Sequence, residues 1–239
     1  MVKNLAFDEQ GKPIPGHEVI QVMQDRTDTV MLAFSCGKDS IAAWLKIKDK
    51  FDRIIPYYMY LIPGLSFVDE ALAYYEQVFN CHIMRVPHPS LYRMLNALVF
   101  QPPERCRMIE AAQLPDFDYD TVNELIRKEL KLSKDVFVAS GVRAADSPQR
   151  RSAINQYGPI NWNRRYFYPV WDMRKDELID LLVHSGVKLP VDYDLFGRSF
   201  DGLDYRFIAP LREHRPKDYA TILEWFPLIE LELLRYGAL

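Results

Sequence analysis

Short apolar runs alternate with amphipathic stretches along most of this chain. The first clear run, VMLAF at 30–34, is typical of a strand buried on both faces of a parallel sheet. Similar runs occupy 53–62 and 135–140, and apolar residues recur at helical spacing in 39–50 and 174–185. Strands that alternate with helices in this way predict an α/β fold with a doubly wound, mainly parallel sheet.

Weaker patterns predict the remaining elements. They are helices at 17–24, 68–79, 120–131, 218–226 and 228–236, and strands at 82–87 and 166–170. The helix faces that we expect to be buried include Val78, Leu125 and Ile179.

Composition places the chain among soluble globular proteins. It has 239 residues, of which 49% are hydrophobic and 26% charged, and its net charge is −3. No apolar run reaches the roughly 18 residues of a membrane span, no signal-peptide core is visible, and a basic field for nucleic acid is lacking. We therefore expect a cytoplasmic protein without a membrane partner. Its expected parts are an N-terminal extension (1–27), a sheet domain (28–186) and a helical C-terminal cap (187–239) packed on that domain.

The cysteines and histidines do not form a metal-binding pattern. Cys36, Cys81 and Cys106 are widely spaced without a C-x-x-C pair, and no two histidines form H-x-x-x-H. This spacing argues against a disulfide framework and against a zinc or iron–sulfur site.

The strongest candidate for chemistry is the segment SCGKDS at 35–40, between the first strand and its helix. Gly37 permits a positive φ, so that consecutive N–H groups can turn toward an anion. Two serine hydroxyls, the positive end of the following helix and the charge of Lys38 add to this site. Together these groups suit a pyrophosphate.

The segment SCGKDS has two other interpretations besides an anion site. It can be an ordinary helix start, in which Ser35 or Asp39 caps the helix and Gly37 eases the turn. A Walker P-loop is excluded, because that motif requires Gly at position 32 and Ser or Thr at position 39, where this chain has Leu32 and Asp39.

Three further segments, together with SCGKDS, resemble one known family in the family's order. SCGKDS is similar to the S-G-G-x-D-S signature of the PP-loop ATP pyrophosphatases, or adenine nucleotide alpha hydrolases. PGLSFVDE (63–70), SGVRAADSPQRR (140–151) and YPVWDMRKDEL (168–178) resemble T-G-x-x-x-P-E-T, G-[IV]-R-A-x-E-S-x-x-R and P-x-x-x-W-x-x-x-D-[VI]. These three motifs are typical of the phosphoadenosine phosphosulfate (PAPS) reductase branch.

The resemblance implies a Rossmann-like domain of PAPS reductase type over 28–186. It also implies ATP, or a related adenine nucleotide, with Mg²⁺ as cofactors and no iron–sulfur cluster. The implied reaction is cleavage at the α-phosphate, which adenylates or otherwise activates an acceptor and releases pyrophosphate.

The same resemblance assigns roles to individual residues. Those expected to bind the nucleotide are Ser35, Cys36, Gly37, Lys38, Asp39, Ser40, Tyr60, Gly64, Gly141 and Arg143. Those expected to act in catalysis are Lys38, Asp39, Arg143 and Arg150. Asp39 is expected either to order the loop or to bind Mg²⁺.

Several of these roles have a simpler alternative. Arg143, Arg150 and Arg151 suit bidentate recognition of phosphate or sulfate, or they form a solvated basic surface. Tyr60 and its neighbours either contact adenine at a strand exit or belong to the core. Cys36, which stands where the family commonly has Gly, is either a thiol activated by a helix N-terminus or a small residue that the loop tolerates.

The C-terminal part departs from the family. PAPS reductases use a cysteine in an E-C-G-[LI]-H type tail, whereas this chain has no cysteine after Cys106. In 193–202 the cysteines of many relatives are also replaced. Asp201, Asp204 and Arg206 nearby either complete a substrate site or form turns.

Three functions therefore compete. The leading one is an ATP pyrophosphatase that adenylates an acceptor. The second is PAPS or adenylyl-sulfate reduction with a thiol from a partner chain. The third is a nucleotide-binding subunit without turnover, for which the resemblance implies a ParB-like partner. A homo-oligomer is a further expectation.

Overall fold

The computed structural model describes residues 5–237. Its strands are β1 (Thr29–Ala33), β2 (Arg53–Tyr60), β3 (Met84–Pro87), β4 (Val138–Ser140), β5 (Ile160–Asn161) and β6 (Tyr166–Phe167). Its helices are α1 (Gly16–Gln24), α2 (Lys38–Ile47), α3 (Ser66–Phe79), α4 (Pro89–Asn96), α5 (Pro103–Ala112), α6 (Tyr119–Glu129), the 3₁₀ helix η1 (Ala144–Asp146), α7 (Pro148–Tyr157), α8 (Lys175–Ser185), α9 (Asp192–Phe196), α10 (Tyr205–His214), α11 (Pro216–Trp225) and α12 (Glu230–Arg235).

The six strands form one sheet in the order β3-β2-β1-β4-β6-β5. The pairs β1–β2, β1–β4 and β4–β6 are parallel, and β5 is antiparallel to β6. Strand order runs from β1 toward β3 in one direction and from β4 toward β5 in the other, so that the order reverses between β1 and β4. This confirms the predicted α/β fold with a mainly parallel, Rossmann-like sheet.

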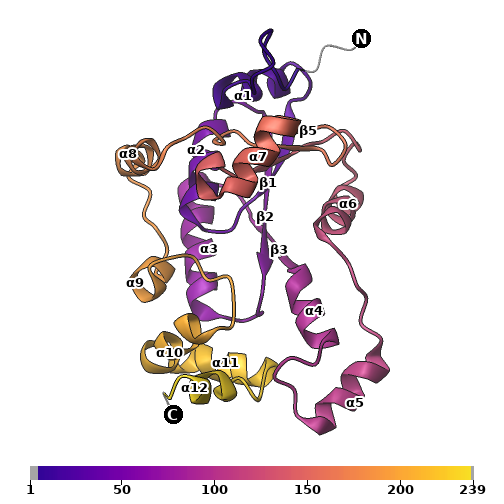
Figure 1. Ribbon diagram of the computed structural model, residues 1–239, viewed down its shortest axis with the longest axis vertical. Helices are drawn as coiled ribbons and strands as arrows, with labels where there is room; N and C mark the ends of the chain where they lie inside the picture. The colour runs from indigo at the N-terminus through magenta and orange to yellow at the C-terminus, as the bar shows by residue number, and fades with distance from the viewer. Residues whose placement is uncertain (1–4, 238–239) are drawn as a thin grey trace. The chain divides into compact units, whose positions relative to one another are not determined.

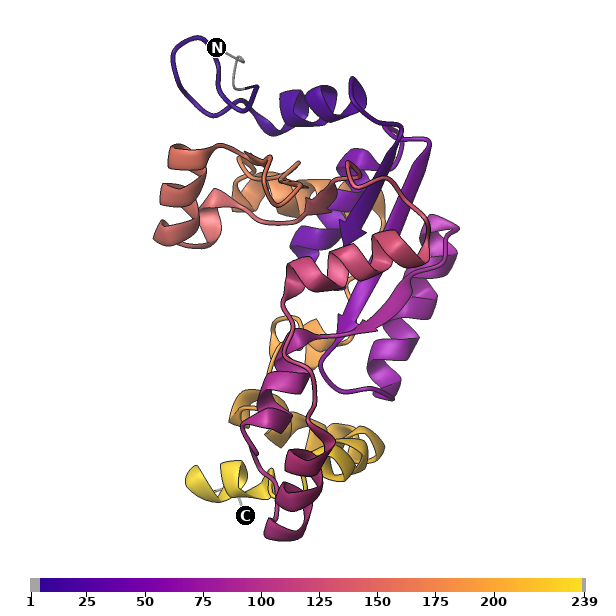
Figure 2. The same ribbon diagram turned by 90° about the vertical axis from the view of Figure 1, so that its right-hand side faces the viewer.

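The chain divides into two compact units. The first consists of residues up to Tyr58, 82–84 and 124–188, and the second of 59–81, 85–123 and 189–239. In the first unit, Val30, Met31 and Leu32 of β1 are fully buried, as the apolar run predicts. Figures 1 and 2 show α2 on one face of the sheet and α6 on the other.

The second unit holds the C-terminal helices α9 to α12, which lie close to one another in Figure 1. Of these, α11 and α12 correspond to the predicted helices at 218–226 and 228–236, whereas α9 and α10 were not predicted. Its core contains four phenylalanines whose rings meet mostly edge to face: Phe67, Phe196, Phe200 and Phe207. Asp218 of α11 is buried and accepts a hydrogen bond from Ser66 Oγ at 2.8 Å, which fixes the start of α3. Within residues 5–237, the structure contains no helix with the length and apolar character needed to cross a membrane.

Three side chains expected in the core are exposed. Val78 is 42% exposed, Leu125 58% and Ile179 46%, so the prediction was wrong for them. Each is on the margin of its helix's apolar stripe, and its neighbours Tyr75, Ile126 and Leu178 take the buried positions. The region 135–140 is likewise strand only from Val138 onward.

Candidate nucleotide site

The segment 35–37 leaves the carboxyl end of β1 and leads into α2. Phe34 positions its start, because the Phe34 N–H donates to the carbonyl of Tyr57 at 2.9 Å and the Phe34 ring meets the Trp44 ring edge-on at 5.2 Å between centroids. The loop is therefore attached to the next strand on one side and to its own helix on the other.

Two serines order this loop from within. Ser40 Oγ donates to the Gly37 carbonyl at 2.8 Å and accepts the Ser35 N–H at 3.2 Å. Ser35 Oγ accepts the Gly37 N–H at 3.4 Å. Gly37 is the residue before the first turn of α2, and no side chain from the described part of the protein caps that helix. The simpler interpretation, in which Ser35 or Asp39 caps α2, is therefore wrong.

The left-handed residue of the loop is Cys36 and not Gly37. Cys36 has φ of +58°, whereas Gly37 has φ of −76° and ψ of 154°, which any residue adopts. The prediction that Gly37 supplies the positive φ was therefore wrong. A residue with a Cβ costs roughly 1 kcal/mol in this region relative to glycine. Cys36 is also only 4% exposed. The loop therefore combines a strained backbone at this residue with a buried thiol.

Asp39, in the first turn of α2, forms ion pairs with two cations. Its Oδ1 accepts from Arg143 Nε at 2.7 Å and its Oδ2 lies 3.1 Å from Lys38 Nζ. Arg143 follows the carboxyl end of β4 and is only 4% exposed. The structure thus joins two predicted site residues that lie 104 positions apart in the sequence.

Asp146 holds Arg143 in place. Its Oδ1 accepts from Arg143 Nη2 at 2.9 Å, and its Oδ2 accepts the Arg143 N–H at 3.2 Å and Arg150 Nη1 at 2.7 Å. Arg150 is half exposed and is linked to Asp39 through Asp146 and Arg143. Asp146 was not among the predicted site residues; an acidic residue three positions after Arg143 was the available signal.

Gly141 allows β4 and α2 to approach closely. A Cβ at this position would lie 2.6 Å from the carbonyl carbon and oxygen of Asp39 and 2.7 Å from the nitrogen of Ser40. Since such distances are not compatible with any side chain, glycine is required here for steric reasons.

The segment after β6 completes the support of Arg143. The Ala144 N–H donates to the Trp171 carbonyl at 2.8 Å, and Arg143 Nη1 donates to the Met173 carbonyl at 3.3 Å. Three of the four segments that carry the family resemblance, 35–40, 140–151 and 168–178, are therefore connected within the first unit.

Tyr60 and Gly64, the other predicted nucleotide contacts, belong to the second unit. The Tyr60 carbonyl accepts the His88 N–H at 3.0 Å, and burial raises the pKa of the Tyr60 phenol. Gly64 has φ of +80°, as a turn after β2 requires. Their role toward a nucleotide stays a prediction.

The acidic and basic residues near 200 are paired locally. Asp204 accepts the Arg206 N–H at 3.0 Å at the start of α10 and pairs with the Arg206 guanidinium at 2.7 Å. Asp201 pairs with Arg198. These contacts correspond to the turn interpretation of the segment.

The residues around Asp39 do not fit a resident magnesium site. Both Asp39 oxygens already face cations, and among residues 5–237 no three His, Cys, Asp or Glu side chains gather to hold a metal. Mg²⁺ binds nucleotides largely through phosphate oxygens and water. Any Mg²⁺ here would therefore depend on oxygen ligands from a bound molecule and from water.

Comparisons with known proteins give only distant likenesses. No protein-family model and no curated protein matches the sequence. Among solved structures, an NH3-dependent NAD synthetase from Campylobacter jejuni has 13% identity and a TM-score of 0.40 over 94% of this chain and 96% of its own. A predicted subunit of tRNA methyltransferase from Methanocaldococcus jannaschii has 17% identity and a TM-score of 0.34 over 80% and 91%. Function therefore has to be argued from the site.

Proposed function

We propose that this protein binds ATP through the 35–40 loop and cleaves it between the α- and β-phosphates, as PAPS reductase-like PP-loop ATP pyrophosphatases do. One observation carries the proposal: the loop leaves β1 and the Arg143 segment leaves β4, where the strand order reverses. In open α/β sheets, ligands bind at the carboxyl ends of the strands at this switch point.

The loop chemistry supports polyphosphate as the ligand. The N-terminus of α2, ten residues long and without a side-chain cap among the described residues, offers N–H groups and a partial positive charge to an anion. Lys38 is about one-third exposed and can move from Asp39 to a phosphate oxygen. Arg143 keeps Asp39 neutralised when Lys38 leaves, because its Nε remains on the other carboxylate oxygen.

The reaction follows from this placement. A nucleophilic atom of the acceptor forms a bond to the α-phosphorus, and the bond from that phosphorus to the bridging oxygen breaks. The electron pair leaves with pyrophosphate, whose growing charge the loop N–H groups and Lys38 stabilise.

Binding measurements test this function without knowledge of the acceptor. We expect ATP and inorganic pyrophosphate to bind, and AMP to bind at least about tenfold more weakly, since AMP lacks the phosphates that the loop would hold. Lys38→Ala should weaken ATP binding and leave AMP binding unchanged. Lys48→Ala, at the exposed residue that follows α2, serves as control. Equal affinity for AMP and ATP, or no effect of Lys38→Ala, would contradict the proposal.

Neither Cys81 nor Cys106 suits the thiol of a reductase, so reduction would require the thiol of a partner chain. Burial raises the pKa of Cys81 to about 11, so that its thiolate is scarce near neutral pH. Cys106 donates to the Gln101 carbonyl at 3.6 Å. Sulfite release from PAPS with added thioredoxin would instead support reduction, and nucleotide binding without pyrophosphate release would support a subunit without turnover.

A further inference from the structure

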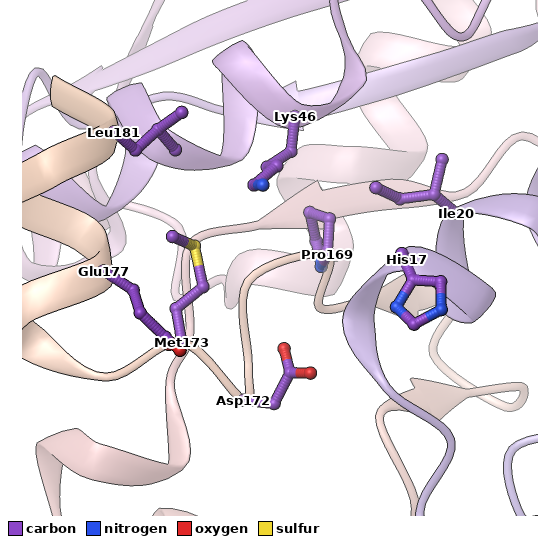
Figure 3. Close-up of a pocket in the computed structure, with 8 residues that line it drawn as sticks. All are labelled: His17, Ile20, Lys46, Pro169, Asp172, Met173, Glu177 and Leu181. Atoms are coloured by element: carbon purple, nitrogen blue, oxygen red, sulfur yellow. The ribbon is translucent and has the colours of Figure 1, made fainter. Parts of the chain in front are cut away.

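A separate pocket of about 400 Å³ lies in the first unit. It is lined by α1, the second half of α2, the segment after β6 and α8, as Figure 3 shows. Its volume is within the range of roughly 300–1,000 Å³ for small-molecule sites. None of its lining residues belongs to the 35–40 loop.

Two carboxylates in this pocket are held by backbone N–H groups. Asp172 accepts the Gly16 N–H at 3.0 Å at the start of α1, and Glu177 accepts the Arg174 N–H at 2.8 Å at the start of α8. The second oxygen of Glu177 lies 3.6 Å from Arg174 Nε, whereas that of Asp172 has no donor among the residues that the structure describes. This second oxygen of Asp172 lies close to Gly16: a Cβ added to Gly16 would be 2.8 Å from it.

The ammonium of Lys46 is the complementary charge. Lys46 forms no ion pair with any residue of the 5–237 range. Figure 3 shows Lys46 and the Asp172 carboxylate entering the space from opposite sides, with Met173 and Pro169 between them. Met173, Leu181 and Ile20 add apolar surface.

We propose that this pocket binds a small zwitterion, an α-amino acid with an apolar side chain. Its carboxylate would pair with Lys46, its ammonium group with Asp172, and its side chain would contact Met173 and Leu181. Because Arg174 offsets Glu177, the pocket presents one carboxylate, Asp172, and one ammonium group, Lys46, which suits a zwitterion better than a phosphate-bearing molecule.

The pocket also has a physical connection to the nucleotide loop. Met173 lines it, and the Met173 carbonyl accepts from Arg143, which holds Asp39. An occupant that shifts Met173 would change the support of the loop. Such coupling acts equally in both directions, so ATP and the amino acid would alter each other's affinity by the same factor.

Calorimetric titration with L-leucine, L-methionine and L-phenylalanine tests this site. We expect at least one to bind, and its amide and its deaminated acid, which each lack one charge, to bind at least about tenfold more weakly. Lys46→Met and Asp172→Asn should each cause a similar loss. The amide oxygen introduced by Asp172→Asn can still accept the Gly16 N–H, so this variant should fold, and Lys48→Met is the matched control beside α2.

The outcomes separate this proposal from the proposed function. Lys46→Met should leave ATP affinity in the absence of amino acid unchanged, whereas Lys38→Ala should leave amino-acid binding in the absence of ATP unchanged. The zwitterion site is wrong if none of the three amino acids binds, if Lys46→Met binds as the wild type does, or if inorganic phosphate binds in their place.

Discussion

Arg143 Nε donates to Asp39 Oδ1 at 2.7 Å and thereby ties the exit of β4 to the first turn of α2. The Arg143 side chain is 5% exposed and the Asp39 side chain 26%. Truncating one partner of such a pair costs more than an exposed ion pair is worth, because the remaining charge keeps its desolvation without its partner.

Arg143→Met should therefore lower the free energy of unfolding by about 2–3 kcal/mol and weaken ATP binding. Arg143→Lys should be nearly as harmful, since one ammonium group cannot replace donors to Asp39, Asp146 and Met173 at once. Urea unfolding and ATP titration measure the two effects. Wild-type stability in both variants would show that the bridge does not order the loop.

Asp146→Asn should weaken ATP binding through Arg143, although Asp146 has no contact with the 35–40 loop among the described contacts. The amide keeps the shape but removes the charge that holds two guanidinium groups. A double-mutant cycle with Asp39→Asn measures the coupling, which we expect to be about 0.5–3 kcal/mol. Arg150→Gln, which alters only the half-exposed partner, is the control. Additive effects would argue against a positioning role.

Gly141→Ala should disrupt the junction of β4 and α2. The added methyl group would overlap the backbone of Asp39 and Ser40, so we expect a loss of about 1–3 kcal/mol in stability and at least about tenfold weaker ATP binding. Gly202→Ala is a suitable comparison, because its Cβ would lie 3.6 Å from the nearest atom. Equal ATP affinity of the two variants would contradict a steric requirement for glycine at position 141.

Cys36→Gly should stabilise the protein by about 1 kcal/mol, since glycine adopts positive φ without strain. Cys36→Ala keeps the strained backbone and removes only the thiol, so it should not stabilise. Thermal unfolding distinguishes the two variants. If either variant loses ATP cleavage while its loop still binds ATP, the thiol takes part in the reaction.

His88 should make stability depend on pH. Burial, aided by Arg93, lowers its pKa in the folded state, while Nδ1 accepts the Ser90 N–H at 3.0 Å at the start of α4. As pH falls, His88 therefore takes up a proton at a higher pH in the unfolded chain than in the folded protein. Its contribution to the free energy of unfolding is present above about pH 6.5 and is lost as pH falls through the folded pKa. His88→Asn retains an acceptor and should flatten the unfolding free energy between about pH 5 and 7. An unchanged slope in that variant would assign the dependence to other groups.

Local pattern was sufficient for the elements that build the site. The apolar run at 30–34 and the helical spacing over 39–50 predicted β1 (Thr29–Ala33) and α2 (Lys38–Ile47) to within a few residues, because burial on both faces of a strand leaves a continuous signal. The short helices α4, α5 and α7 were not predicted. Each begins with a proline in its first turn, which is a start signal. In α5 and α7 the apolar periodicity behind that proline is weak, and α4 is only eight residues long.

The geometry of the site depended on contacts that sequence does not encode locally. Composition favoured Gly37 as the left-handed residue, but the hydrogen bonds of Ser35 and Ser40 close the loop so that Cys36 takes this conformation. Likewise, Arg143 matched a phosphate-binding pattern, and only the fold shows that Asp39 and Asp146 already engage its guanidinium.

The support of the loop by Met173 has a consequence for the order of events during synthesis. A nascent chain that has exposed β1 and α2 still lacks Arg143, which lies 104 positions after Asp39, and the carbonyl of Met173, which comes later still. The nucleotide loop therefore reaches its final form only when the first unit is nearly complete on the ribosome.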